Sequence, residues 1–261
     1  MAITGQWKGF GLTDIGRIRQ TNQDTLRIDN ELGLWIVADG MGGHAGGDVA
    51  SQLTVETIHQ YIADHVPSTI QSESVDCAAI IQTAMVQANT TLRKRAKAEP
   101  ALKGMGTTVV LVFMPDTNGE NAFIAHVGDS RAYLIRDKNF TALTRDHTLL
   151  EERIQVGLLP RSTPASHQLG HVLTRGVGVE STVDPEIVQH IFQPTDEILL
   201  CSDGLNKMMN DDQIFEVLQK NPTRTGREKC QTLIDEANRL GGKDNTTALL
   251  IQAQEISEGP R

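Results

Sequence analysis

The chain has 261 residues, of which 39% are hydrophobic and 22% are charged, and its formal net charge is −9 at pH 7. These values are typical of an ordinary globular protein, and the negative charge argues against nucleic acid as a partner because phosphate backbones attract basic surfaces. We expect a cytoplasmic protein with no membrane partner, because no signal peptide or membrane span is visible and the three cysteines form no CxxC pair. A monomer is the default expectation for its oligomeric state.

Hydrophobic periodicity predicts strands first and then two helices. Strand-like runs at residues 8–13, 25–29 and 34–38 precede a helix, in which apolar residues recur near i, i+4 spacing from Val49 to Val66. A second helix is predicted from about residue 75 to 97, with Pro100 just beyond it. Four further strands are predicted, at residues 107–113, 122–127, 132–135 and 140–143.

The second half mixes strands and helices. A segment at roughly residues 146–178 contains one short predicted helix (148–156) and a loop of the kind that is usually functional or mobile. Strands near 183–192 and 198–201, helices at 211–219 and 227–240, and a strand at 246–252 follow. This order predicts a single α+β domain over residues 1–261, with sheets inside, helices outside and a disordered tail of a few residues.

Four aspartates lie beside small or turn-forming residues at predicted strand ends: Asp39, Asp129, Asp203 and Asp244. Each alone could be a turn former. If they converge, however, their mutual repulsion requires cations between them. Carboxylate oxygens are ligands that suit Mg²⁺ or Mn²⁺.

A competing interpretation comes from residues 40–45, GMGGHA, which fit the dinucleotide-binding pattern G-x-G-x-x-A. That pattern requires a βαβ unit with an acidic residue at the end of the second strand. The corresponding distance falls near residues 56–64, inside a predicted helix. A P-loop also fails, because Asp48 stands where lysine would follow Gly47.

Seven segments, in order, resemble the motifs of bacterial metal-dependent protein phosphatases of the PPM, or type 2C, class. They are TDIGRIRQTNQD (13–24), VADGMGGH (37–44), GMGTT (104–108), HVGDSR (126–131), LTRDH (143–147), LCSDGL (200–205) and GKDNTT (242–247). The resemblance covers about residues 8–252. It implies a four-layer α-β-β-α sandwich, in which pairs of helices flank two antiparallel sheets and residues 146–178 form a flap subdomain.

The resemblance also implies a site for two Mg²⁺ or Mn²⁺ ions. Asp39 would bridge them, the Gly40 carbonyl would ligate one, and Asp203 and Asp244 would hold the other. Asp129 and Asp203 would match a third, weaker metal position of bacterial members. The implied function is a protein serine/threonine phosphatase that hydrolyses phosphoserine and phosphothreonine monoesters by attack of a hydroxide bridging two metal ions.

Further roles follow from the same resemblance. Arg19 matches a phosphate-binding arginine, whose planar fork suits two phosphate oxygens, and Asp24 matches a carboxylate that orients metal-bound water. Many eukaryotic members have a histidine as general acid where Met41 stands, so the acid here is left open between His44 and a metal-bound water. His171 is the flap residue expected to contact substrate.

The implied partners are phosphorylated proteins, substrates of a bacterial Ser/Thr kinase. A catalytically inactive relative that only binds phosphoproteins is the alternative from another class. Inactive relatives usually lack one or more metal aspartates, and all are present in this chain.

Overall fold

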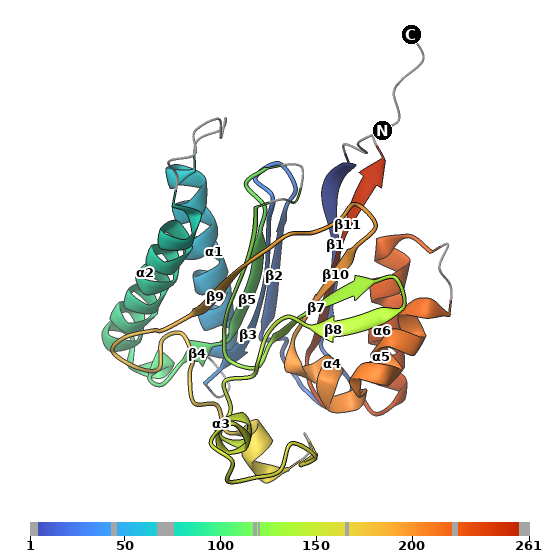
Figure 1. Ribbon diagram of the computed structural model, residues 1–261. Helices are drawn as coiled ribbons and strands as arrows, with labels where there is room; N and C mark the ends of the chain where they lie inside the picture. The colour runs from blue at the N-terminus through green and yellow to red at the C-terminus, as the bar shows by residue number, and fades with distance from the viewer. Residues whose placement is uncertain are drawn as a thin grey trace.

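The computed structural model describes residues 5–42, 46–66, 76–116, 119, 121–164, 167–220 and 224–255. These residues form two antiparallel sheets packed face to face, with helices on both outer faces (Figure 1). The first sheet has the order β1 (Gly5–Asp14), β11 (Thr246–Glu255), β10 (Glu197–Cys201), β7 (Arg131–Arg136), β8 (Asn139–Ala142). The second has the order β2 (Asp24–Asp29), β3 (Leu34–Met41), β5 (Val109–Phe113), β6 (Ala122–Val127), β9 (Glu186–His190), and β4 (Gly106–Thr107) pairs with β3.

Alternation along β3 explains why the layers form. Leu34, Ile36 and Ala38 pack in the core beneath one pair of helices. Trp35 and Val37 point to the opposite face, into the core between the two sheets. Since successive side chains of a strand point to opposite faces and β3 is covered on both, its sequence is the uninterrupted apolar run LWIVA.

Helices cover the outer face of each sheet, as predicted. α1 (Gly47–His65) and α2 (Cys77–Ala98) pack on the second sheet, and α5 (Asp211–Gln219) and α6 (Gly226–Arg239) pack on the first. Capping boxes fix the starts of α5, at Asn210, and α6, at Thr225, where side chains satisfy backbone N–H groups that have no partner within the helix. The α+β four-layer sandwich expected from the sequence is therefore confirmed. No helix within the described ranges is long and apolar enough to cross a membrane.

Strand direction brings the functional residues to one end of the sandwich. In the antiparallel pairings, β3, β6 and β10 end at the same edge at which β2, β7 and β11 begin. The loops at that edge carry the aspartates found in the sequence. The segment between β8 and β9, with α3 (Leu149–Gln155) and the 3₁₀ helix η3 (Gln168–His171), lies below this end in Figure 1.

Two local predictions were wrong. Residues 107–113 do not form one strand, because Thr108 leaves the ladder: its N–H donates to the Asp39 carbonyl and its hydroxyl accepts the Asp39 N–H. A short helix, α4 (Asp203–Met208), was also missed, since six residues are too few to show helical periodicity. The predicted tail lies outside the described residues from residue 256 onward.

Candidate active site

A cavity of about 570 Å³ lies at the end of the sandwich where those loops meet. Its walls include four of the five proposed carboxylates, Asp39, Asp129, Asp203 and Asp244. The structure therefore brings together side chains that are up to 205 positions apart in the sequence, from Asp39 to Asp244. Gly40, Arg19 and His171 also line the cavity.

Asp39 lies on β3 opposite Asp24 of β2. Burial raises the pKa of Asp39 well above its ordinary value, and the charges of Asp24, Asp203 and Asp129 add to this effect. A carboxylate so placed is stable as an anion only if a cation lies nearby. The site therefore favours a bound cation.

Gly40 follows Asp39 and has no room for a side chain. A Cβ at this position would lie 1.9 Å from the Gly47 carbonyl oxygen and 2.8 Å from that of Gln23. The Gly40 N–H donates to the Gln23 carbonyl at 3.1 Å. Glycine is thus required where β3, the loop before β2 and the start of α1 come together.

Asp24 is buried behind Asp39 and does not line the cavity. Its Oδ2 accepts hydrogen bonds from the hydroxyls of Ser202 and Thr247, each at 2.7 Å. Burial raises the pKa of Asp24 to about 6, although these two hydrogen bonds oppose the shift. The placement fits a residue that orients neighbouring groups rather than one that touches substrate.

Asp129 lies in the turn between β6 and β7. Burial raises its pKa to about 7, and the charges of Asp203 and Asp146 contribute further. Gly128 before it has φ 104°, and a Cβ there would approach Thr108 to 2.6 Å. The turn is therefore packed directly against the residue that holds Asp39 in place.

Asp203 and Asp244 share one basic partner, Lys207. The Lys207 Nζ lies 2.5 Å from Asp203 Oδ2 and 2.8 Å from Asp244 Oδ2. Arg19 also pairs with Asp244, through Nε at 2.8 Å and Nη2 at 2.9 Å. Burial raises the pKa of Asp244, but the hydrogen bond and charge of Lys207, with the charge of Arg19, outweigh burial and hold that pKa below its ordinary value.

The side chain of Asn245 holds the loop that carries Arg19 at three backbone positions. Its Oδ1 accepts the Gln23 N–H at 2.9 Å, and its Nδ2 donates to the carbonyls of Ile15 and Thr21 at 3.0 and 2.9 Å. Asn245 adjoins Asp244, so the same turn positions a carboxylate and the arginine that pairs with it.

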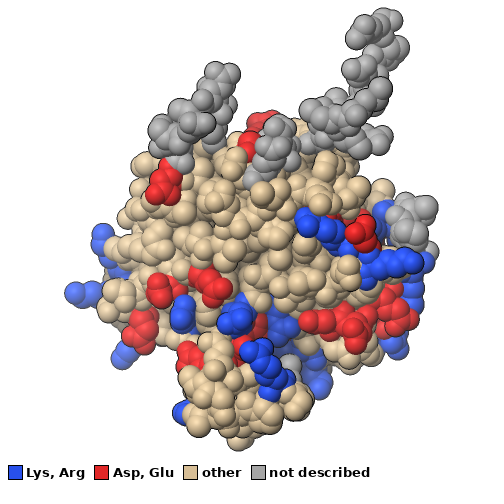
Figure 2. Space-filling view, viewed as in Figure 1, with Lys and Arg blue, Asp and Glu red and all other residues tan. Residues whose placement is uncertain are grey.

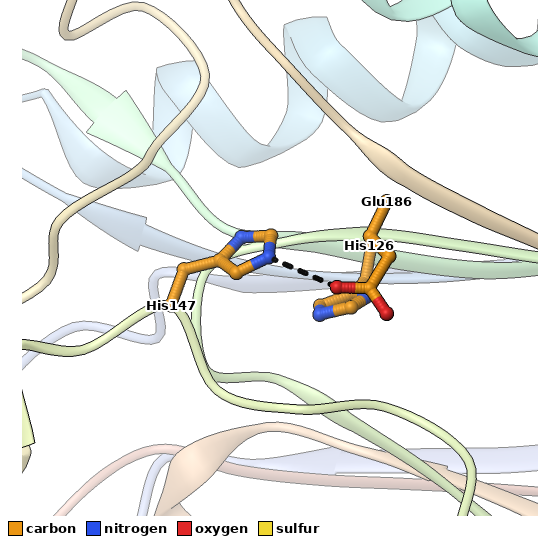
Figure 3. A group of neighbouring side chains, drawn as sticks. All are labelled: His126, His147 and Glu186. Carbon is orange, nitrogen blue, oxygen red and sulfur yellow. Dashed lines mark ion pairs between the residues drawn. The ribbon is translucent and has the colours of Figure 1, made fainter. Parts of the chain in front are cut away.

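A second cluster, His126, His147 and Glu186, lies next to the turn that carries Asp129 (Figure 3). Its ligand atoms lie within 4.8 Å of one another, close enough to suggest a metal site. However, His147 Nδ1 accepts the Gly128 N–H at 3.2 Å, and its Nε2 lies 3.5 Å from Arg175 Nη1 and 3.8 Å from Glu186 Oε2. Both ring nitrogens of His147 thus have protein partners, and we interpret the cluster as a support for the Gly128 turn.

Three further residues named in the motifs or near them bear on the chemistry of the site. His44 lies outside the described residues, so the structure does not place it. Met41 lines the cavity and has no proton to donate. Cys201 is buried beside Ser202, and burial raises the pKa of its thiol to about 12, so this thiol is a poor nucleophile.

Sequence reasoning missed three residues that build the site: Lys207, Ser202 and Asn245. For Lys207 a signal existed, because Asp203 and Lys207 have the i, i+4 spacing that pairs opposite charges on a helix. Ser202 and Asn245 act through contacts with distant residues, at separations of 178 and more than 220 positions. No local pattern reveals such contacts.

Comparisons with known proteins agree with this arrangement. The protein-family model described as Protein phosphatase 2C matches residues 17–236. The serine/threonine phosphatase stp of Listeria innocua is 35% identical over 250 residues, which are 95% of this chain and 96% of that protein. The solved serine/threonine phosphatase of S. agalactiae is 34% identical with a TM-score of 0.83, over 95% of this chain and 100% of that chain.

A further solved structure holds metal. The catalytic domain of the serine/threonine protein phosphatase PstP, in complex with two manganese ions, is 30% identical with a TM-score of 0.79, over 95% of this chain and 98% of that chain. Together, the sandwich, the acidic cavity and these relatives define a phosphoprotein phosphatase. Within that class, the chain belongs to the protein phosphatase 2C family.

Proposed function

We propose that the chain hydrolyses phosphoserine and phosphothreonine monoesters in proteins, using two divalent cations held by Asp39, Gly40, Asp203 and Asp244. The observation that carries this proposal is the convergence of these residues and Asp129 on one cavity. When bound, Mg²⁺ or Mn²⁺ would lower the pKa of a bridging water, so that hydroxide is available near neutral pH to attack phosphorus.

The residues present fit such a cation site. Oxygen donors from carboxylates and a backbone carbonyl are the ligands that hard divalent ions prefer. Asp203 Oδ1 is buried and has no hydrogen-bond partner among the described residues, and a buried oxygen of this kind normally has one. The manganese-bound PstP structure supports the metal type. A third cation at Asp129 and Asp203 is part of the proposal.

Arg19 is proposed to bind the phosphate. Its side chain is 49% exposed at the cavity, and its contacts with Asp244 use Nε and Nη2. A guanidinium has further N–H donors in the same plane, which suit the equatorial oxygens of a phosphoryl group. Asp24, through Ser202 and Thr247, would hold the loops from both sheets in register around the cavity.

Two histidines complete the proposal. His171 of η3 lines the cavity and would contact the substrate from residues 146–178, the proposed flap. The bridge Thr107–Val177 attaches the end of this segment to β4, and the bridge Thr148–Leu173 joins its two arms. His44 is proposed to assist departure of the serine or threonine alkoxide, since Met41 cannot donate a proton.

The proposed partners are phosphorylated proteins made by a bacterial Ser/Thr kinase, and the proposed state is a cytoplasmic monomer of one domain. On the face shown in Figure 2, Lys and Arg side chains gather beside Asp and Glu side chains where the segment with α3 meets the rest of the molecule. Basic side chains there would attract an anionic phosphoprotein despite the net charge of −9.

The test is hydrolysis of p-nitrophenyl phosphate and of a phosphothreonine peptide with Mn²⁺, before and after EDTA. We expect turnover that EDTA abolishes and Mn²⁺ restores. Asp39→Asn should lose at least about 10³-fold in kcat/KM. Asp212→Asn, which removes an exposed carboxylate in the first turn of α5, is the matched control and should keep full activity.

Two results would contradict the proposal. One is turnover that persists unchanged in EDTA. The other is an Asp39→Asn variant that folds and retains wild-type kcat/KM. Tight phosphopeptide binding without turnover in Mn²⁺ would instead favour the phosphoprotein-binding alternative.

A further inference from the structure

Lys207 is a basic residue at the cavity for which neither the sequence motifs nor the proposed reaction has a role. The described residues that line the cavity include two lysine or arginine residues, Arg19 and Lys207. Their side chains are 49% and 30% exposed, respectively. Lys207 is thus the more enclosed of the two.

The ammonium group of Lys207 lies between two proposed metal ligands. It is 2.5 Å from Asp203 Oδ2 and 2.8 Å from Asp244 Oδ2. Both aspartates are largely enclosed, at 17% and 14% exposure of the side chain. A single cation therefore connects a carboxylate that begins α4 with one that precedes β11.

The charge of Lys207 also acts on the carboxylates that it does not touch. It lowers the pKa of Asp39 and of Asp129, against the larger effect of burial. One ammonium group thus counters repulsion among four carboxylates, which is the electrostatic task that a divalent cation would perform in this cavity.

Metal binding and lysine pairing are mutually exclusive at these oxygens. The Lys207 ammonium group and a metal ion cannot both bind Asp203 Oδ2 and Asp244 Oδ2, because two cations held at such short distances repel strongly. Lys207 can withdraw, since its four-carbon stem is flexible and its side chain is partly exposed. Withdrawal breaks both ion pairs, so it weakens metal binding by the free energy of those pairs.

We propose that Lys207 is an internal competitor for the metal site: its ammonium group occupies the cation position between Asp203 and Asp244 in the metal-free chain and must leave before a divalent cation binds there. This inference rests on the metal centre of the proposed function. Lys207 would stabilise the metal-free protein and set a higher metal concentration for occupancy.

The experiment compares wild type with Lys207→Met, which keeps the length of the stem and removes the charge. Both proteins are stripped with EDTA, dialysed and titrated with Mn²⁺ by isothermal calorimetry, and their melting temperatures are measured with and without Mn²⁺. We expect Mn²⁺ to bind Lys207→Met about tenfold more tightly. We also expect the metal-free variant to melt at least about 2 °C below the metal-free wild type.

Lys220→Met is the matched control. Lys220 makes an i, i+4 pair with Glu216 on α5 at 3.2 Å, as Lys207 does with Asp203, but it lies outside the cavity and is 59% exposed. Lys220→Met changes the net charge of the protein as much as Lys207→Met does, so both variants attract Mn²⁺ equally at long range. Its Mn²⁺ affinity should equal that of the wild type.

Circular dichroism shows whether Lys207→Met folds. Lys207→Gln and Lys207→Arg keep the proposal testable if Lys207→Met does not fold. Lys207→Gln should bind Mn²⁺ more tightly than wild type, as Lys207→Met does. Lys207→Arg keeps a cation and should stay within about threefold of wild type.

The outcomes distinguish failure of the proposed role of Lys207 from failure of the proposed metal centre. Absence of Mn²⁺ binding by wild type would overturn the metal centre itself, and this inference with it. Binding by wild type with equal or weaker binding by folded Lys207→Met and Lys207→Gln would overturn the role of Lys207 alone. An equal gain in affinity for Lys220→Met would do the same, because it would show a general charge effect.

Discussion

Asp24 of the second sheet and Ser202 at the end of a strand of the first are joined by a hydrogen bond of 2.7 Å, from Ser202 Oγ to Asp24 Oδ2. Ser202 Oγ also accepts the Thr247 N–H at 2.9 Å, and the Thr247 hydroxyl donates to the same Asp24 oxygen. All three residues are buried. The two sheets are therefore connected by polar contacts directly behind the acidic cavity.

Ser202→Ala tests this connection. The substitution removes a donor from buried Asp24 and an acceptor from the Thr247 N–H, and unsatisfied buried groups cost about 1–3 kcal/mol. We expect the free energy of unfolding to fall by that amount in urea denaturation, with reduced phosphatase activity. Thr83→Ala, which removes an exposed hydroxyl bonded to a helix carbonyl, should cost less than about 0.5 kcal/mol. Equal stability of the two variants would contradict the interpretation.

Gly40→Ala should disrupt the site by steric overlap. The added Cβ would lie 1.9 Å from the Gly47 carbonyl oxygen at the start of α1, so helix and strand must separate. We expect a loss of about 3 kcal/mol in stability, together with weaker Mn²⁺ binding. Gly104→Ala is the control, because its Cβ would meet nothing within 4 Å although φ is +82°, and it should cost about 1 kcal/mol. Denaturation and calorimetry measure both effects.

Arg131→Lys should loosen the segment between β8 and β9. Arg131 binds Asp146 through Nε and Nη2, each at 2.7 Å, and this two-point contact holds the start of the segment against β7. Lysine keeps the charge but cannot form the planar pair. We expect faster cleavage by trypsin within residues 146–178 and a loss of about 1–2 kcal/mol in stability. Arg239→Lys, which changes an exposed pair with Glu236, should leave the cleavage rate unchanged.

The contribution of His147 to stability should fall as the pH drops below about 6.5, whereas the raised pKa values of Asp24, Asp39 and Asp129 act in the opposite direction. Burial lowers the pKa of His147 to about 3, with His126 and Arg175 adding to the shift, whereas an unfolded histidine has a pKa near 6.5. Between these values the unfolded chain binds more protons, so acid favours unfolding by up to about 1.4 kcal/mol per pH unit for this residue.

His147→Gln removes that contribution. We expect the stability of the variant relative to the wild type to rise as the pH falls from 6.5 to 4, measured by urea denaturation, with lower stability at pH 7.5 because the Gly128 turn loses its support. The exposed His65 provides the control, and His65→Gln should keep the wild-type slope. An unchanged slope in His147→Gln would show that the buried imidazole is not the source.

The fold was largely predictable because its signals are local. The runs that form β3, β6 and β10 are apolar and end in Asp-Gly or Gly-Asp turns, and these features can be recognised within ten residues. The family motifs then correctly predicted the four layers, and four of the aspartates in those motifs line the cavity. The exceptions are α4, too short to show a period, and the break at Thr108, which depends on hydrogen bonds to Asp39.

The interior of the site was less accessible from the sequence. Ser202 and Asp24 are 178 positions apart, and no local sequence pattern around either residue predicts their contact. The i, i+4 ion pair between Lys207 and Asp203 could have been predicted from the sequence. The second ion pair of Lys207, with Asp244, forms only because α4 and the turn before β11 meet. Local sequence determines which residues carry charge, and tertiary structure determines which charges meet.

Asn245 holds the backbone of the Arg19 loop in place, and this order bears on both the rate and the affinity of substrate binding. One amide group binds the backbone at Ile15, Thr21 and Gln23, so the backbone of the loop is ordered when the chain folds. If Arg19 binds phosphate as proposed, little ordering entropy remains to be lost in the loop when substrate binds. Phosphate binding would then require the Arg19 side chain to leave Asp244, which is a movement of one side chain.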